Sequence, residues 1–424
     1  MKDLLIENLV DLDGSRRSFA ISAGRFVDAG TLGGDIRRLD GKGRLITPGL
    51  VDLHTHLREP GREDAETVLS GSQAAVAGGY TAISAMPNTS PVADTAGVVE
   101  QVYRLGQSHG LCEVFPIGAV TVGQAGEQLA ELVAMNQSEA QVRLFSDDGY
   151  CVWDPLIMRR ALEYVKQFDG IIAQHAQDPR LTQESQMNEG IVSARLGLKG
   201  WPAAAEESII ARDILLTDHV ESRLHICHVT TARGVELIRW AKARGIRVTA
   251  EVTPHHLLLT DQLAETYDPI YKVNPPLRTE RDVMALREGV VDGTIDIIAT
   301  DHAPHPTESK ECEWQSAAFG MVGLETSLSV SYLALVSSGL MAWSQLIERM
   351  SITPAQIAGY SNQGSLENGA PASFAIFDPN QSWQVEPAAL RSKSKNTPFA
   401  QMELPGRVVA TFFRGEFVFG EEAL

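Results

Sequence analysis

Two histidines one residue apart, His54 and His56, end an apolar stretch that begins at Leu50. Along a strand, the side chains of residues i and i+2 lie on the same face, about 6.6 Å apart. Two imidazoles at that spacing can converge on one metal ion, and zinc binds neutral imidazole nitrogen at roughly 2.0–2.1 Å. Short matches of this kind also occur by chance, so the rest of the chain decides whether the pair is a metal site.

Further residues of metal-ligand type end other apolar runs. They are Asp147, Asp148, His175, His228 and Asp301. A lone histidine is more often an ordinary buried residue, but five runs that end in this way are hard to explain by chance. Four histidines and two carboxylates can hold a pair of divalent ions, about 3.5–4 Å apart. Neighbouring strand residues point to opposite sides, so one of Asp147 and Asp148 is expected to reach the metal and the other to cap the turn with Gly149.

Strand-like runs alternate with helix-like segments from residue 48 onward. Eight strands are predicted, over residues 50–54, 80–85, 114–119, 142–146, 170–175, 223–228, 246–252 and 295–300. Helices closed by glycine are predicted over 64–77 and 232–244. This alternation predicts an α/β fold with parallel strands, and eight of them favour a (β/α)8 TIM barrel, whose active sites form at the carboxyl ends of the strands. A doubly wound sheet competes, but its first turn is usually glycine-rich, and here that turn is His-x-His.

The two ends of the chain carry short strands instead. Brief apolar runs and turn residues fill positions 1–47, and strands are predicted over 374–377, 408–413 and 417–419. Neither end can bury a core alone. We therefore expect one small β-sandwich domain, residues 1–47 plus 362–424, beside a catalytic barrel over residues 48–361.

A last barrel helix is predicted to have Thr353 as N-cap and Pro354 at its first position, and to close at Gly359.

The composition excludes several classes of partner. The 424 residues carry a formal net charge of −18. Nucleic acids and anionic membrane surfaces require clustered lysine and arginine, so neither is an expected partner. Four scattered cysteines without a C-x-x-C pair fit a reducing cytoplasm. We recognise no signal peptide and no apolar run of about 18 residues, so a cytoplasmic protein without a membrane span is expected.

Motifs along nearly the whole chain resemble, in the same order, those of the class I (bacterial type) dihydroorotases of the amidohydrolase superfamily. They are DLHTHLREPG at 52–61, AMPNT at 85–89, FSDDG at 145–149, HVTT at 228–231, TAEVTPHH at 249–256, NPPLR at 274–278, ATDHAPH at 299–305, FGMVGLE at 319–325 and KNTPF at 395–399. The resemblance implies a barrel of the metal-dependent hydrolase type. It also implies a zinc-dependent, reversible cyclisation of N-carbamoyl-L-aspartate to L-dihydroorotate and water in de novo pyrimidine (UMP) biosynthesis.

The resemblance further implies a role for individual residues. Two zinc ions per subunit would be held, one by His54, His56 and Asp301, the other by His175 and His228, with Asp148 as the bridge. Asp301 would also be the catalytic proton carrier. The substrate would contact His56, Arg58, Asn88, Asn274, His305, Phe319 and Gly320. One departure is Gln177, where relatives often have an acidic residue; it is expected to alter the surroundings of His175 without removing that ligand.

Other polar residues near these motifs have more ordinary interpretations. His255, His256 and His302 are expected to be structural, or to support the ligands from behind. Arg58 offers a planar fork that suits the carboxylate of dihydroorotate. The polar stretch 306–316 is interpreted as a mobile cover of the site, with an inert surface loop as the alternative.

Two rival functions remain. A hydantoinase or allantoinase would use the same scaffold on another cyclic amide, but Arg58, Asn88, Asn274 and the FGMVGLE motif favour a substrate carboxylate. A catalytically inert barrel that only scaffolds aspartate transcarbamoylase should lack ligands, whereas this ligand set is complete. The expected partner is the small-molecule substrate. A homodimer and an association with aspartate transcarbamoylase are suggested by the resemblance alone.

Overall fold

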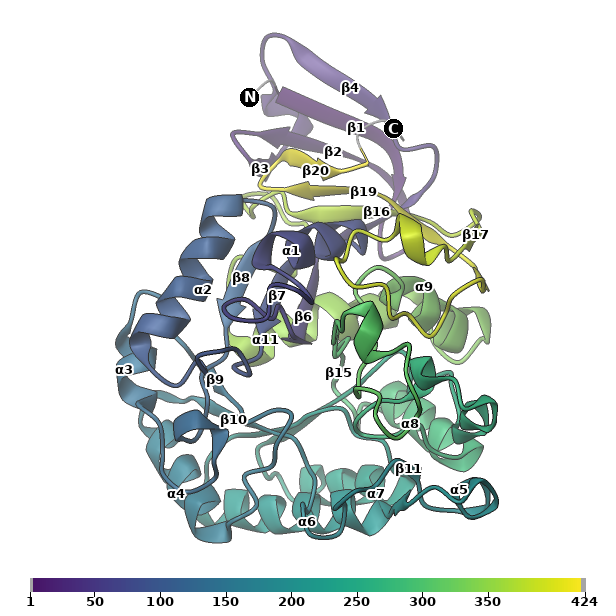
Figure 1. Ribbon diagram of the computed structural model, residues 1–424. Coiled ribbons are helices and arrows are strands. Elements are labelled where there is room, and N and C mark those ends of the chain that lie inside the picture. The colour runs from purple at the N-terminus through teal and green to yellow at the C-terminus, as the bar shows by residue number, and fades with distance from the viewer. Residues whose placement is uncertain (1–2, 421–424) are drawn as a thin grey trace.

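The computed structural model describes residues 3–420 (Figure 1). Its central part contains all eight predicted strands. They are β6 (Leu50–Thr55), β7 (Tyr80–Ala85), β8 (Glu113–Pro116), β9 (Leu144–Phe145), β10 (Ile171–Gln174), β13 (Leu224–Ile226), β14 (Val248–Val252) and β15 (Ile297–Ile298). Several are shorter than predicted at the carboxyl end. There the chain leaves the sheet early, and the residues that follow are free to turn inward.

The eight strands form two parallel sheets, β6-β7-β8 and β9-β10-β13-β14-β15. Isolated parallel bridges link these sheets on both sides: Gly118 pairs with Phe145, and Thr55 pairs with His302. The amide of His56 donates to the His302 carbonyl at 2.9 Å across the second link. Neighbours therefore follow chain order, without the order reversal of a doubly wound sheet.

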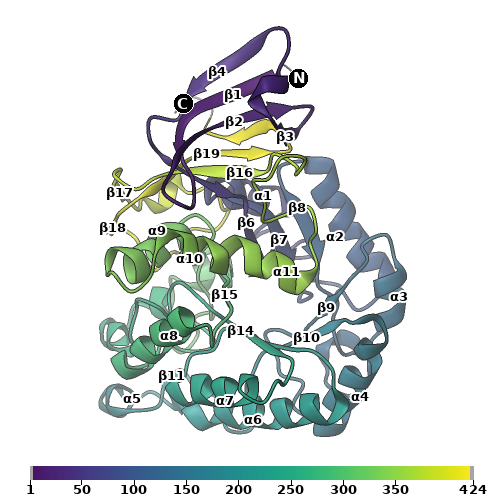
Figure 2. The same cartoon turned by 180° about the vertical axis from the view of Figure 1, so that it is seen from behind.

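Helices lie outside the parallel strands (Figures 1 and 2). They are α1 (Val68–Ala77), α2 (Ala96–His109), α3 (Leu132–Gln137), α4 (Pro155–Val165), α5 (Ile191–Leu196), α6 (Ala203–Val220), α7 (Ala232–Lys242), α8 (Glu280–Asp292), α9 (Ser327–Ser331), α10 (Trp343–Ile347) and α11 (Thr353–Ala358). Strand residues such as Val51, Leu53 and Ile297 pack into one buried cluster with Ile357 of α11.

The predicted helix ends are correct in part. Helix α1 begins later than predicted, because Thr67 forms a capping box with Ser70. Gly359 closes α11 in the left-handed conformation, as predicted. Thr353 is not an N-cap, so that prediction is wrong. A π-helical turn over Glu348–Ile352 runs directly into α11, and Thr353 already has helical backbone angles.

Strands from both ends of the chain share one sheet at the edge of the molecule (Figure 2). Its members are β1 (Asp3–Val10), β2 (Arg16–Ser22), β3 (Arg25–Val27), β4 (Ile36–Asp40), β5 (Leu45–Pro48), β16 (Phe374–Asp378), β19 (Arg407–Phe413) and β20 (Glu416–Phe419). The two ends meet where β5 pairs antiparallel with β16, with Ile46 opposite Ile376. The expected pairing of the two ends is confirmed.

Four further strands of two residues each form two small sheets of their own. β11 (Met187–Asn188) pairs with β12 (Gly200–Trp201), and β17 (Trp383–Gln384) pairs with β18 (Glu403–Leu404). None of the helices within residues 3–420 is long and apolar enough to cross a membrane.

Candidate metal centre

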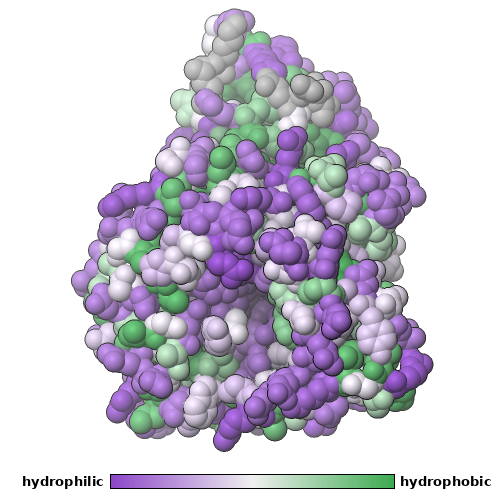
Figure 3. Space-filling model, viewed as in Figure 1, coloured by the Kyte–Doolittle hydropathy of each residue, from purple (hydrophilic) through white to green (hydrophobic). Residues whose placement is uncertain are grey.

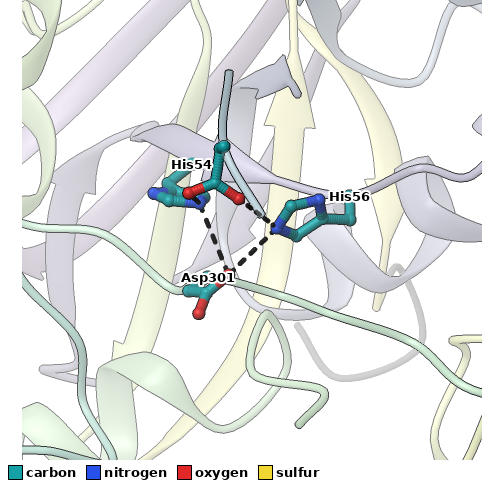
Figure 4. A group of neighbouring side chains, drawn as sticks. His54, His56 and Asp301 are labelled. Atoms are coloured by element: carbon teal, nitrogen blue, oxygen red, sulfur yellow. Dashed lines mark hydrogen bonds and ion pairs between the residues drawn. The ribbon is translucent and has the colours of Figure 1, made fainter. Parts of the chain in front are cut away.

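Six side chains from five strand ends converge in one place; Figure 4 labels three of them, His54, His56 and Asp301. His54 lies in β6 and His56 directly follows it, while the others lie within three residues after β9, β10, β13 and β15. All six are at most 4% exposed: His54, His56, Asp148, His175, His228 and Asp301. His228 and Asp301 have positive φ angles of 30° and 48° where the chain turns out of its strand. The convergence predicted from the strand ends is observed.

The six side chains form two groups that share Asp148. In the first, His56 Nε2 lies 3.1 Å from Asp301 Oδ1 and 3.3 Å from Asp148 Oδ2, and His54 Nε2 lies 3.4 Å from an oxygen of each carboxylate. In the second, His175 Nδ1 lies 2.9 Å from His228 Nε2. Each of these two nitrogens lies 3.2 Å from Asp148 Oδ1. Within each group all ligand atoms lie within 4.8 Å of one another.

Hydrogen bonds from the nitrogen that faces away from the cluster set the tautomers of three of these histidines. His54 Nδ1 donates to Glu251 Oε1 at 2.5 Å, and His56 Nδ1 donates to Asn88 Oδ1 at 2.9 Å. His175 Nε2 donates to Gln177 Oε1 at 2.7 Å, so the predicted effect of Gln177 on the surroundings of His175 is a direct contact. In the neutral rings, the opposite nitrogens carry lone pairs that face the carboxylates.

This arrangement requires positive charge at its centre. His54 Nε2 is buried and has no hydrogen-bond partner among the described residues. Burial lowers the pKa of His54, but the carboxylates of Asp148, Glu251 and Asp301 outweigh burial and raise that pKa well above its ordinary value. Divalent cations between the lone pairs and the carboxylates would meet the same demand. The residues present therefore fit a metal centre.

Glu251, in the middle of β14, is a contributor that the motif analysis did not single out. It accepts hydrogen bonds from His54 Nδ1, from His225 Nε2 at 3.0 Å and from the His228 amide at 3.2 Å. Its carboxylate is 1% exposed. A charged residue inside an otherwise apolar strand was the available signal, because such a residue needs a partner in the interior.

The two adjacent aspartates are now distinguished. Asp148 belongs to the cluster, as the resemblance implied. The Asp147 carboxylate turns away and accepts from the amides of Val120 and Thr121 at 2.8 and 3.1 Å, and from the Thr121 hydroxyl. The expectation that it caps the turn at Gly149 is wrong. Asp147 instead fixes the loop after β8 to the end of β9.

The predicted substrate residues lie around the cluster. Arg58 donates through Nε to the Pro304 carbonyl at 3.1 Å, and its two terminal nitrogens make no hydrogen bond within residues 3–420. Burial and the neighbouring Arg62 lower the pKa of Arg58 to about 10, so the guanidinium stays charged. The Asp301 carboxylate attracts the Arg58 charge and favours the protonated guanidinium, and the Arg58 charge lowers the pKa of His305. A charged fork with unused donors thus lies beside the cluster.

Asn88 and Asn274 each have part of their amide free. Asn88 uses its oxygen on His56, so it orients a ligand in addition to its predicted contact with substrate. Asn274 donates to Gln177 Oε1 at 3.3 Å, and its own oxygen is buried without a hydrogen-bond partner among the described residues. The unused amide groups remain available for a polar ligand.

His305, Phe319 and Gly320 form a second wall. His305 Nε2 donates to the Phe319 carbonyl at 2.7 Å, and burial lowers the pKa of His305 to about 3, so the ring is neutral. Gly320 has φ of 145°, and a Cβ there would lie 2.7 Å from His305 Nε2. Only glycine permits this approach. Figure 3 shows a hollow with hydrophilic residues around it on the face seen in Figure 1.

The remaining histidines are mostly structural, as expected. His302 pairs with Glu66 at 3.2 Å and accepts from the Gly323 amide at 3.1 Å. His256 donates to the Pro275 carbonyl at 3.1 Å. His255 is buried with Nε2 unpaired within the described chain, and burial lowers its pKa to about 4.

Comparisons with known proteins place this geometry in context. A family model described as dihydro-orotase-like matches residues 43–234. The dihydroorotase of Streptomyces coelicolor is 64% identical over 91% of this chain and 90% of its own length. That of Mycobacterium tuberculosis is 54% identical over 89% and 88%. Among solved structures, an L-hydantoinase (dihydropyrimidinase) from Arthrobacter aurescens aligns with a TM-score of 0.88 at 26% identity, covering 98% of this chain and 96% of that one.

Proposed function

Because the chain belongs to the dihydroorotase family, we propose that its six buried ligand-type residues hold two zinc ions for that family's reaction. The enzyme is a cyclic amide hydrolase that interconverts N-carbamoyl-L-aspartate with L-dihydroorotate and water in pyrimidine biosynthesis. One observation carries the metal assignment: three histidines turn lone pairs toward two buried carboxylates, and His54 Nε2 has no hydrogen-bond partner among the described residues.

His54, His56 and Asp301 would hold one ion, and His175 and His228 the other, with Asp148 between them. The two groups of close ligand atoms that share Asp148 support this division. Neutral imidazole and carboxylate ligands suit zinc. When bound, zinc supplies a Lewis acid for the amide carbonyl and makes a nearby water more acidic.

Asp301 is the proposed proton carrier. Its Oδ1 faces His54 and His56, while its Oδ2 makes no hydrogen bond within the described residues. In the hydrolytic direction Asp301 takes a proton from the attacking water and delivers it to the leaving ring nitrogen, and in the biosynthetic direction it runs the reverse transfer. We expect Asp301→Asn to keep metal but lose nearly all turnover. Metal analysis beside a hydrolysis assay checks this, and full activity would remove Asp301 from the mechanism.

Arg58 is the proposed anchor for the substrate carboxylate, with Asn88 and Asn274 as amide donors. Its unused terminal nitrogens and its partly buried position support this role, because charge-assisted forked contacts are strongest away from water. Arg58→Lys keeps the charge but loses the fork. We expect KM for dihydroorotate to rise about 10- to 100-fold, the loss of a charged hydrogen bond of about 1.5–3 kcal/mol.

His56, His305, Phe319 and Gly320 would form the wall against the pyrimidine ring. An assay of dihydroorotate beside hydantoin and allantoin, with and without a chelator, tests the assignment as a whole. Turnover of dihydroorotate that a chelator abolishes is expected. Preference for hydantoin, which lacks the carboxylate, would contradict the role of Arg58.

We also propose that the linked parallel strands close into a (β/α)8 barrel over residues 48–361, with a separate β-sandwich domain from residues 1–47 and 362–424. The chain-order pairing and the two linking bridges support closure. The four free cysteines accord with a cytoplasmic location. A homodimer and binding to aspartate transcarbamoylase are further proposals, which sedimentation of the enzyme alone and mixed with the transcarbamoylase would test.

A further inference from the structure

The stretch interpreted as a mobile cover contains a buried lysine that fastens it down. Lys310 is 6% exposed. Its ammonium donates to the carbonyls of Lys272 at 3.0 Å, Ala318 at 2.9 Å and Gly320 at 3.0 Å. An ammonium has three N–H donors, and here each has its own acceptor. The loop is therefore held from inside by one cation.

A second buried lysine completes the contact in the opposite direction. Lys272 is 1% exposed, and its ammonium donates to the Trp314 carbonyl at 2.7 Å and the Gln315 carbonyl at 3.2 Å. The same ammonium lies 4.4 Å from the centroid of the Phe319 ring. Lys272 thus binds two carbonyls of the segment that carries Lys310, and Lys310 binds the carbonyl of Lys272 together with two carbonyls farther along its own segment. We call this reciprocal contact of Lys272 and Lys310 the lysine clasp.

The clasp contains no carboxylate. Neither lysine forms an ion pair within residues 3–420, so carbonyl dipoles and one aromatic face balance both charges. Burial and the neighbouring Lys272 charge lower the pKa of Lys310 to about 7, while the charge of Asp268 favours the protonated form. Two buried cations without an ion-pair partner among the described residues are a costly way to hold a loop, since an apolar side chain would avoid their desolvation. What the two lysines achieve, and an apolar side chain would not, is to hold the neighbouring backbone carbonyls at fixed positions.

The groups that the clasp positions belong to the wall formed by His305, Phe319 and Gly320. The Gly320 amide donates to the Lys272 carbonyl at 3.0 Å, so Lys272 O receives both this amide and the Lys310 ammonium. The Gly320 carbonyl also accepts from Asn396 Nδ2 at 3.2 Å. Between the two clasped carbonyls, of Ala318 and Gly320, lies the Phe319 carbonyl, which accepts from His305. The clasp therefore fixes both neighbours of the peptide that orients His305.

We propose that Lys272 and Lys310 are positioning residues, whose clasp sets Phe319 and Gly320 against His305 and so determines the affinity for the pyrimidine ring. The inference rests on the proposed role of this wall in substrate binding. Neither lysine touches a metal ligand or the reacting atoms. Loss of the clasp should therefore weaken binding of ground state and transition state alike.

The first test is Lys310→Met in the zinc-loaded enzyme, with the exposed Lys199→Met as matched control. We expect KM for dihydroorotate to rise at least about tenfold while kcat changes less than about threefold and zinc content stays the same. Lys310→Arg should not restore KM, because a planar guanidinium cannot reach three carbonyls arranged around one nitrogen. An unchanged KM in Lys310→Met, with the zinc content of the parent, would overturn the inference.

The second test needs no variant, and it checks in the native enzyme that both lysines are buried, which the inference requires. Reductive methylation of the native enzyme, mapped by mass spectrometry, should modify Lys199 and spare Lys272 and Lys310. Full modification of both clasp lysines in active enzyme would overturn the inference. Arg58→Lys separates the two proposals: if it raises KM and Lys310→Met does not, only the clasp fails. If Arg58→Lys leaves KM unchanged, the proposed substrate site fails instead.

Discussion

The proposed ligand histidines differ most in the side chain that accepts the hydrogen bond from their outer ring nitrogen. His54 donates to a carboxylate, Glu251, whereas His56 and His175 donate to the side-chain amides of Asn88 and Gln177. A carboxylate partner makes an imidazole a stronger ligand than an amide does. We therefore expect His54 Nε2 to be the strongest of the three nitrogen ligands. We also expect Glu251 to be the supporting residue with the largest effect on metal affinity.

Glu251→Gln tests this difference. The Glu251 carboxylate accepts hydrogen bonds from His54, His225 and the His228 amide, whereas glutamine has only one acceptor oxygen. The hydrogen bond that sets the tautomer of His54 is therefore weakened or lost. We expect zinc affinity, measured by competition with a chelator, to fall about 10- to 100-fold. The exposed Glu236→Gln is the control, and circular dichroism verifies folding. Equal affinity in both variants would contradict the role of Glu251.

Glu325 provides a prediction on pH. Its carboxylate accepts from the amides of Arg391 and Ser392, and burial raises its pKa to about 7. Because the folded state holds this proton more tightly than the unfolded chain, the contribution is largest below pH 4.5 and is lost as the pH rises to about 7. Glu325→Gln keeps an acceptor and removes the titration.

The free energy of unfolding of the zinc-loaded enzyme, measured in urea at pH 5 and 7.5, should therefore drop more in the parent than in Glu325→Gln. The advantage of the variant should grow with pH. Parallel pH curves for the two proteins would show that Glu325 titrates normally.

At the scale of elements, the site depends on how the loops after β6 and β7 meet. Gly61 has φ of 96°, and a Cβ there would lie 2.1 Å from the Ser90 carbonyl oxygen. The Ser90 amide also donates to the Pro60 carbonyl at 2.9 Å. These two loops carry Arg58 and Asn88, so their contact sets the distance between two proposed substrate groups.

Gly61→Ala should push the two loops apart. We expect KM for dihydroorotate to rise and the free energy of unfolding to fall by about 1–3 kcal/mol, since backbone atoms must move at a strained φ angle. Gly97→Ala, where a Cβ meets nothing within 4 Å, is the control and should leave KM unchanged. A crystal structure of Gly61→Ala with unmoved loops would refute this account.

The sequence predicted strand positions well because apolar runs and glycine-closed helices are local signals. The structure contains all eight predicted parallel strands, and it brings His54, Asp148 and Asp301 together as predicted. The predictions failed where distant partners decide. The Asp147 carboxylate accepts hydrogen bonds from the loop after β8, and Thr353 continues a preceding π-helical turn into α11 instead of capping that helix. Glu251 was not singled out, since its partners His54 and His225 come from other strands.

At the scale of the whole molecule, the metal should contribute to stability. Without a cation, two carboxylates and several imidazole lone pairs are buried together at the carboxyl ends of the strands. An ion that binds only the folded state adds about 2.7 kcal/mol at 100 times its Kd. We expect chelation to lower the Tm and added zinc to restore it. An unchanged Tm after complete loss of zinc would show that the ligands are satisfied without it.

The pairing of β5 with β16 has a consequence for synthesis on the ribosome. Ile46 emerges early, but its partner Ile376 follows about 330 residues later. At about 5–20 residues per second, the β5 edge waits roughly 15–65 s for its neighbour. During that interval the nascent chain presents an open, apolar strand edge, which is where a chaperone would act and where premature association between neighbouring nascent chains would begin.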